Sequence, residues 1–216
     1  FIAYTAYDSI IYATWTPDLQ TRISSGTLAR NRYPWGADFN GEIGYVFYFD
    51  AHLNLYFRTT MDGINWSPEQ RYNLVWPSPY PQSVLCWTQM AVTDAGNPIL
   101  VFDIINGDDI EYPYYGKVYV SYAQGEPCIE VSSSFALPDT ECFYPTIATG
   151  GNKVAVLYCM PRNNEPESLN WWDFWINWST DNGVTWGIPK CCTQTLISRP
   201  GLQQLVKRIV ILRNHV

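Results

Sequence analysis

Three stretches of the chain repeat one pattern of apolar and polar positions. Each reads as a short strand, a turn that contains glycine and asparagine, and a strand of nearly continuous apolar residues, at 38–48, 94–103 and 149–158. Glycine and asparagine adopt the positive φ that tight hairpin turns require. The stretches start 56 and then 55 residues apart. The pattern therefore predicts a tandem repeat built from strands and turns.

Each copy continues with a second predicted hairpin. A third strand lies at 54–60, 117–122 and 172–179, and a turn that contains glycine follows it each time. Four antiparallel strands in each repeat are typical of a β-propeller blade. We therefore predict an all-β fold, a β-propeller with about four repeats of ~55 residues that is incomplete or is completed by strand addition.

The two ends of the chain hold partial copies. Residues 1–7 and 10–15 predict a hairpin with no first strand before it, and the apolar run Ile209, Val210, Ile211 and Leu212 lies 55 residues after the run at 154–157. An unpaired apolar strand is a template for pairing. The C-terminal run is expected either to close the ring or to complete a sheet of another copy, which gives a homo-oligomer or polymer. The expected parts of a single domain 1–216 are a partial blade at 1–30, blades at about 31–80, 81–138 and 139–197, and a closing or donated strand at 198–216.

Residues 179–186, Ser-Thr-Asp-Asn-Gly-Val-Thr-Trp, resemble the Asp-box of sialidase-like β-propellers, and residues 60–66 are a shorter variant. A degraded third candidate stands at 16–18. In such a turn the aspartate accepts backbone N–H bonds, the glycine supplies an unusual φ and the tryptophan fills the adjacent core. In the family the boxes lie away from the catalytic centre. The resemblance thus implies structural roles for Thr60, Asp62, Gly63, Trp66, Ser179, Asp181, Gly183, Thr185 and Trp186.

The composition fits packed strands and argues against two kinds of partner. Charged residues make up 15% of the chain and aromatic residues 16%, whereas globular domains average about 25% charged residues. The formal net charge of −7 argues against a nucleic-acid partner, which needs a basic surface. No apolar run reaches the roughly 18 residues of a membrane span.

The six cysteines suggest an oxidising compartment, because disulfides persist there and the number is even. We expect an extracellular or cell-surface location, with structural disulfides favoured over free buried thiols. Adjacent strand residues point to opposite faces, so neighbouring cysteines would join different partners. The pairing stays open, and the candidates are Cys86, Cys128, Cys142, Cys159, Cys191 and Cys192.

The sequence predicts no catalytic residue, no cofactor and no metal site. A sialidase needs three arginines for the substrate carboxylate and a tyrosine nucleophile activated by a glutamate. The family's Arg-Ile-Pro motif is absent, and an intact enzyme of this family has about six blades. The acidic residues Asp103, Asp108, Asp109 and Glu111 suit Ca²⁺ as oxygen ligands. They lack the spacing of a known loop, so a solvated acidic loop is the other interpretation.

The preferred function is a non-catalytic structural and binding module that assembles through its terminal strands. One alternative is a sialidase-like glycoside hydrolase or a fragment of one, and another is a lectin-like propeller that binds a glycan. Aromatic segments at 112–115 and 171–175 could stack on sugars or pack between blades. Three arginines converging at the mouth of a central channel would favour the enzyme, and aromatic rings exposed on a surface would favour the lectin.

Overall fold

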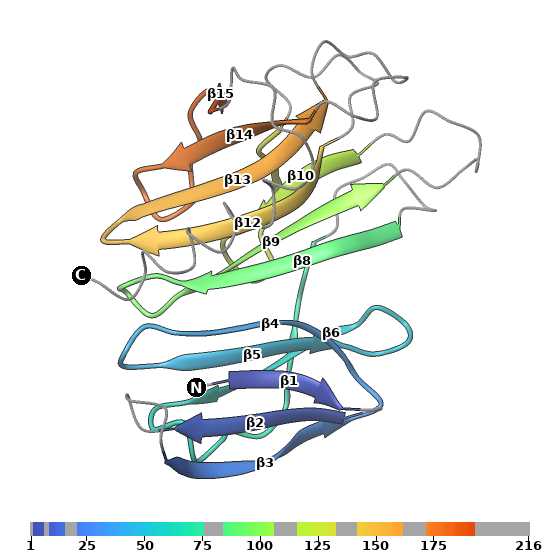
Figure 1. Cartoon of the computed structure of the whole chain (residues 1–216), viewed down its shortest axis with the longest axis vertical. Coiled ribbons are helices and arrows are strands. Elements are labelled where there is room, and N and C mark those ends of the chain that lie inside the picture. Colours follow the sequence, from blue (N-terminus) through green and yellow to red (C-terminus); the bar gives the residue numbers. More distant parts are fainter. Residues whose placement is uncertain are drawn as a thin grey trace.

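The computed structural model describes residues 2–6, 9–15, 21–75, 84–105, 116–132, 142–161 and 172–192, and every element in them is a β-strand (Figure 1). These residues include no helix long and apolar enough to cross a membrane. Several predicted features lie outside the described residues: the degraded Asp-box at 16–18, Asp108, Asp109, Glu111, the aromatic segment at 112–115, Trp171 and the C-terminal run at 209–212.

The strands form four antiparallel sheets in chain order, three strands in sheet I and four each in sheets II, III and IV. Consecutive strands are neighbours, so every sheet is an up-and-down meander. Sheet I contains β1 (Ile2–Ala6), β2 (Ser9–Trp15) and β3 (Arg22–Arg30); sheet II contains β4 (Tyr33–Phe39), β5 (Gly44–Phe49), β6 (Leu55–Thr60) and β7 (Gln70–Tyr72). Sheet III contains β8 (Val84–Val92), β9 (Pro98–Ile105), β10 (Gly116–Ser121) and β11 (Ile129–Glu130); sheet IV contains β12 (Phe143–Gly150), β13 (Lys153–Pro161), β14 (Trp172–Ser179) and β15 (Lys190–Cys191).

The first strands of sheets II, III and IV lie beside one another. The Thr88 hydroxyl of β8 donates to the Trp35 carbonyl of β4 at 2.9 Å. The Thr149 hydroxyl of β12 donates to the Val92 carbonyl of β8 at 2.8 Å. Sheets that share a line of first strands have the blade arrangement of a β-propeller, and this confirms the predicted fold. Sheets I and IV stand at opposite ends of the array (Figure 1), so the described residues form an open series of blades.

Each gap between neighbouring sheets holds its own apolar core. In β9, Ile99 and Val101 pack in the core toward sheet IV, whereas Leu100 and Phe102 pack in the core toward sheet II. Side chains alternate between the two faces of a strand, so a strand covered on both faces is apolar at every position. This explains the continuous apolar runs in the sequence.

Sheet I lacks a strand on the side that faces the shared line. In sheets II and III, the last strand, β7 or β11, is followed along the chain by the first strand of the next sheet. β3 is followed by β4 in the same way, so β3 matches a fourth strand, and β1 and β2 match second and third strands. No strand among the described ranges occupies the first-strand place in sheet I.

Candidate functional site

The Asp-box turn between β14 and β15 is organised by one carboxylate. Asp181 accepts hydrogen bonds from the Thr185 N–H at 2.8 Å and from the hydroxyls of Ser179 and Thr185 at 2.6 Å each. The Ser179 hydroxyl accepts the N–H of Gly183 at 2.9 Å, and Gly183 has a φ of 87°. The bond from Ser179, followed by those from Thr185, lowers the pKa of Asp181 to about 2. The carboxylate of Asp181 therefore forms its hydrogen bonds within its own turn.

The shorter box between β6 and β7 has the same design. Asp62 accepts the N–H groups of Asn65 and Ile64 at 2.8 Å each, and these two bonds hold its pKa well below the ordinary value. The Thr60 hydroxyl accepts the N–H of Gly63 at 2.8 Å, and Gly63 has a φ of 69°. This aspartate too serves its own turn.

The tryptophan of each box fills one gap between sheets. Trp66 lies in the core between sheets I and II, with its ring centroid 5.4 Å from that of Tyr12. Trp186 packs against the core between sheets III and IV and donates its indole N–H to the Gly183 carbonyl at 2.9 Å. The two tryptophans therefore cover two of the three gaps between the four sheets.

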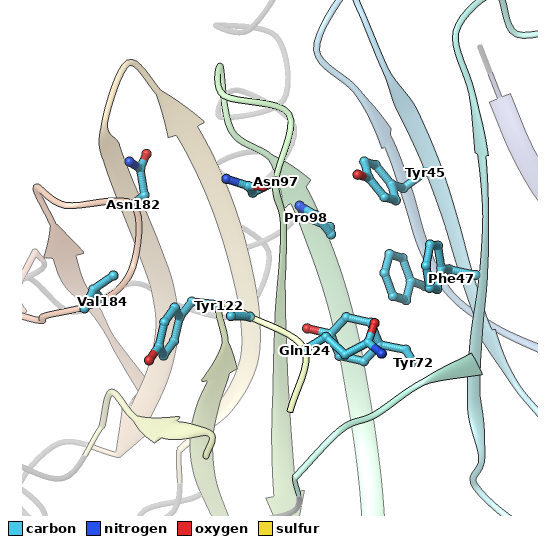
Figure 2. Close-up of a pocket in the computed structure, with 11 residues that line it drawn as sticks. Tyr45, Phe47, Tyr72, Asn97, Pro98, Tyr122, Gln124, Asn182 and Val184 are labelled. Atoms are coloured by element: carbon cyan, nitrogen blue, oxygen red, sulfur yellow. The ribbon is translucent and has the colours of Figure 1, made fainter. Parts of the chain in front are cut away.

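A pocket of about 430 Å³ opens at the remaining gap, between sheets II and III. Its lining comes from β5, β6 and β7 of sheet II, from the β8–β9 and β10–β11 turns of sheet III, and from the Asp-box turn of sheet IV (Figure 2). The lining residues are Tyr45, Phe47, Phe57, Tyr72, Asn97, Pro98, Tyr122, Ala123, Gln124, Asn182 and Val184.

Aromatic rings of sheet II form one wall of this pocket. Phe47 and Phe57 stack with centroids 5.3 Å apart, and Tyr72 meets both rings edge-on. The Tyr45 hydroxyl donates to the Gly96 carbonyl at 3.0 Å, and the Tyr72 hydroxyl is 3.1 Å from the Ser121 hydroxyl. Burial raises the pKa of Tyr45 and of Tyr72, so both phenols are neutral at physiological pH. The wall is uncharged, and its hydroxyls fix the orientation of its rings.

Polar side chains from three turns complete the lining of this pocket. Asn97 lies in the β8–β9 turn, Tyr122 and Gln124 in the β10–β11 turn, and Asn182 in the Asp-box turn (Figure 2). Within the described ranges, these four side chains make no hydrogen bond to another residue. The three amides offer both donors and acceptors. The pocket therefore combines apolar rings with hydrogen-bonding groups that are available to a ligand.

Among the described residues that line the pocket there is no aspartate, glutamate, histidine, lysine or arginine. Nor do the described residues contain a group of three side chains that could hold a metal ion. Glycoside hydrolysis generally uses two carboxyl groups that flank the scissile bond. The groups in this pocket suit binding of a neutral ligand.

None of the pocket residues is among the site residues predicted from the sequence. The signal available was the aromatic character of β5, β6 and β7 at alternate positions, where β9 and β10 carry smaller apolar residues. Such rings are ordinarily read as core. Their contribution to a pocket depends on what lies across the gap.

Asp103, one of the four acidic residues interpreted as either a solvated loop or Ca²⁺ ligands, instead bridges two sheets. Its carboxylate accepts the N–H of Trp87 in β8 at 2.6 Å and the N–H of Tyr144 in β12 at 3.1 Å, and its side chain is fully buried. Both donors lie where a bulge interrupts strand pairing. Asp103 therefore satisfies donors that the bulges release, which accounts for a buried carboxylate. Trp87 and Tyr144 are each about half exposed, with ring centroids 5.1 Å apart.

A tyrosine, a glutamate and two arginines come together in sheet II. Arg58 donates to the Tyr48 hydroxyl at 3.3 Å, and Arg32 pairs with Glu69 at 3.2 Å. Glu69 lies close enough to affect the pKa of Tyr48, whose side chain is fully buried. Burial raises the pKa of Tyr48 to about 12, which keeps the phenol neutral. This set has the residue types of a sialidase centre, but the tyrosine has neither the access nor the ionisation that a nucleophile needs.

No disulfide joins any two of the five cysteines that the structure describes, which are Cys128, Cys142, Cys159, Cys191 and Cys192. Cys142 packs in the core between sheets III and IV with Tyr158 and Met160. Cys159 lies between those two residues in β13 and therefore points to the opposite face. Burial raises the pKa of Cys128, Cys142 and Cys159 to about 12 each, so these thiols stay protonated. The Cys86 side chain lies outside the described residues.

No protein-family model matches the chain, and no curated protein matches it. Among solved structures, a Hadza microbial sialidase is 13% identical with a TM-score of 0.47; the match covers 88% of this chain and 40% of the sialidase. An endo-arabinase from Bacteroides thetaiotaomicron VPI-5482 is 12% identical with a TM-score of 0.42, covering 89% of this chain and 75% of that one. A xylan beta-1,4-xylosidase from Bacillus halodurans C-125 is 12% identical with a TM-score of 0.42, covering 89% and 41%. The chain spans less than half the length of the sialidase and the xylosidase.

Proposed function

We propose that this protein is a non-catalytic module that binds carbohydrate in the pocket between sheets II and III. The observation that carries the proposal is that two surfaces of different chemistry line one pocket. One is the wall of Phe57, Tyr72 and their neighbours, and the other is the set of unengaged amides at Asn97, Gln124 and Asn182. A sugar ring has the matching chemistry, with C–H groups that pack on aromatic faces and hydroxyls that bond to amides.

The dimensions and rigidity of the pocket agree with this role. Its volume of about 430 Å³ lies within the ~300–1,000 Å³ that is usual for small-molecule sites. Stacked and edge-on rings hold the wall in place before a ligand arrives, which reduces the ordering cost of binding. Each hydrogen bond between a side-chain amide and the sugar contributes only about 0.5–1.5 kcal/mol to the binding free energy. We therefore expect affinities in the micromolar to millimolar range.

The test is calorimetric titration of the native chain with a panel of neutral oligosaccharides, followed by two pocket variants. Gln124→Ala removes an exposed amide. Asn182→Gly removes a half-buried amide, and glycine tolerates the φ of 59° at this position. Each should weaken binding roughly threefold to tenfold. The matched controls are Gln89→Ala, an exposed amide outside the pocket, and Asn31→Gly, an exposed asparagine with a φ of 53°. Equal effects of pocket and control variants would refute the assignment of the site.

A second proposed role is assembly through strand addition. It is supported by sheet I, which has three strands where the others have four, and by β1, whose outer edge is paired with no other described residue. The proposed occupant of this edge is the run Ile209 to Leu212 of another copy. Deletion of residues 205–216 should then abolish polymers in electron micrographs while the chain stays folded. Unfolding of the monomer by the same deletion would mean instead that the run closes the chain's own ring.

A further inference from the structure

The turn between β10 and β11 keeps the frame of an Asp-box although its sequence has lost the box. Gly125 has a φ of 82°, close to the 69° of Gly63 and the 87° of Gly183, and all three lie in the turn between third and fourth strands. When the glycines are aligned, Ser121 stands at Ser179. Ala123 and Cys128 then stand where Asp181 and Trp186 stand in the complete box.

The strand register shows which surface each of these positions covers. Trp186 packs against the core between sheets III and IV, and the sheet III side of this core includes Ile99, Val101, Val120 and Val131. The pairing register of the strands gives the equivalent positions in sheet II, which are Tyr45, Phe47, Phe57 and Tyr72. These four are the aromatic wall of the pocket, and Cys128 is the residue packed against their core.

The pocket therefore marks the place of a missing indole. Trp66 and Trp186 fill the gaps on either side of it, and a tryptophan buries about 150–250 Å² of surface. A cysteine in the same position covers much less of the wall. Trp35 is buried deeper in this core, but the position after the turn holds a cysteine, and this is the gap that holds the pocket.

We propose that one pyranose ring of a neutral sugar occupies this vacant tryptophan position, against Phe57 and Tyr72. The inference rests on the carbohydrate-binding role proposed above and names its ligand class. A six-membered sugar ring is flat and of a size similar to an indole, so it presents an apolar face to the same wall. Sugars that carry a carboxylate are disfavoured, because the described lining residues include no arginine or lysine to pair with them.

The decisive variant is Cys128→Trp, which restores the missing side chain, with Cys128→Ala as its matched control. The probes are neutral methyl pyranosides, each paired with the methyl uronide that differs only by its carboxylate. We expect Cys128→Trp to weaken binding of the neutral sugar by more than about tenfold. Cys128→Ala should stay within about twofold of the native chain, and the uronide should bind at least about tenfold more weakly than its neutral partner.

Free indole gives a second readout that needs no variant. Indole should bind the native pocket and displace the neutral sugar competitively. If the sugar binds but indole does not displace it, or if Cys128→Trp binds as the native chain does, the tryptophan position is not the site, although carbohydrate binding would stand. Uronide binding equal to that of the neutral sugar would overturn the ligand class. If indole binds and no neutral sugar does, both this inference and the proposed function fail.

Discussion

Cys128 occupies in sheet III the position that Trp186 occupies in sheet IV, each at the end of a turn whose glycine has a positive φ. This difference between cysteine and tryptophan is visible on the two sides of sheet III. Toward sheet IV the wall of β9 and β10 is covered by an indole, and toward sheet II the equivalent wall is open to a pocket. A pocket thus lies where this repeat has a cysteine in place of the tryptophan.

Trp186→Cys should convert the covered gap into a second open one. Removing a packed tryptophan leaves a cavity, so we expect the free energy of unfolding to fall by about 2–4 kcal/mol. Urea denaturation measures the change. Ile188→Ala, at a side chain that is 66% exposed, is the control and should be nearly neutral. An unchanged urea midpoint for Trp186→Cys would contradict the role given to this indole.

The Asp-box of sheet IV should make stability depend on pH in the acid range. The pKa of Asp181 is lowered from 3.8 to about 2 on folding, so its ionised form stabilises the fold above about pH 4. That contribution should be lost as the pH falls from about 4 to 2. In Asp181→Asn the urea midpoint should therefore fall less steeply over this window than in the native chain. Parallel curves would show that the carboxylate bonds do not contribute.

Asp103→Ala should loosen the contact between sheets III and IV. It leaves the N–H groups of Trp87 and Tyr144 without their carboxylate partner, at a cost of about 2–4 kcal/mol. Hydrogen exchange of these two amides should accelerate in Asp103→Ala. In Asp103→Asn the exchange rates should lie between those of Asp103→Ala and the native chain, because asparagine keeps one acceptor oxygen. Unchanged exchange at both amides would count against the bridge.

Thiol reactivity should separate the cysteines by burial. Cys192 is exposed and should react with a thiol reagent in the native chain, whereas Cys128, Cys142 and Cys159 should react only after unfolding. In denaturant without reductant, at least four thiols should titrate, because no disulfide joins any two of the five described cysteines. A lower count would reveal a disulfide that the structure does not show and would support an oxidising compartment.

The strands could be predicted from the sequence because most of them are covered on both faces and are therefore apolar along their length. The runs at β5, β9 and β13 are apolar for this reason, and the turns of the two Asp-boxes have residues whose local bonds are the same in any context. Fold class and turn chemistry could therefore be predicted.

The pocket could not be predicted in the same way. The repeat predicts the turn at 121–128, but that turn keeps only the serine and glycine of the box, and the surface that Cys128 covers follows only from the structure. Asp103 was interpreted as part of an acidic loop, because the bulges that give it two donors are not encoded by a recognisable pattern. Both features depend on contacts between sheets, which spacing along one chain does not reveal.

The central claim is that a neutral sugar enters the pocket between sheets II and III. The most direct measurement is a nuclear magnetic resonance titration of the isotope-labelled native chain with a neutral methyl pyranoside. The account predicts saturable shifts of the side-chain amide signals of Asn97, Gln124 and Asn182, with the control amide of Gln89 unmoved. Shifts confined to the exposed rings of Trp87 and Tyr144, or no saturable shift at any signal, would contradict it.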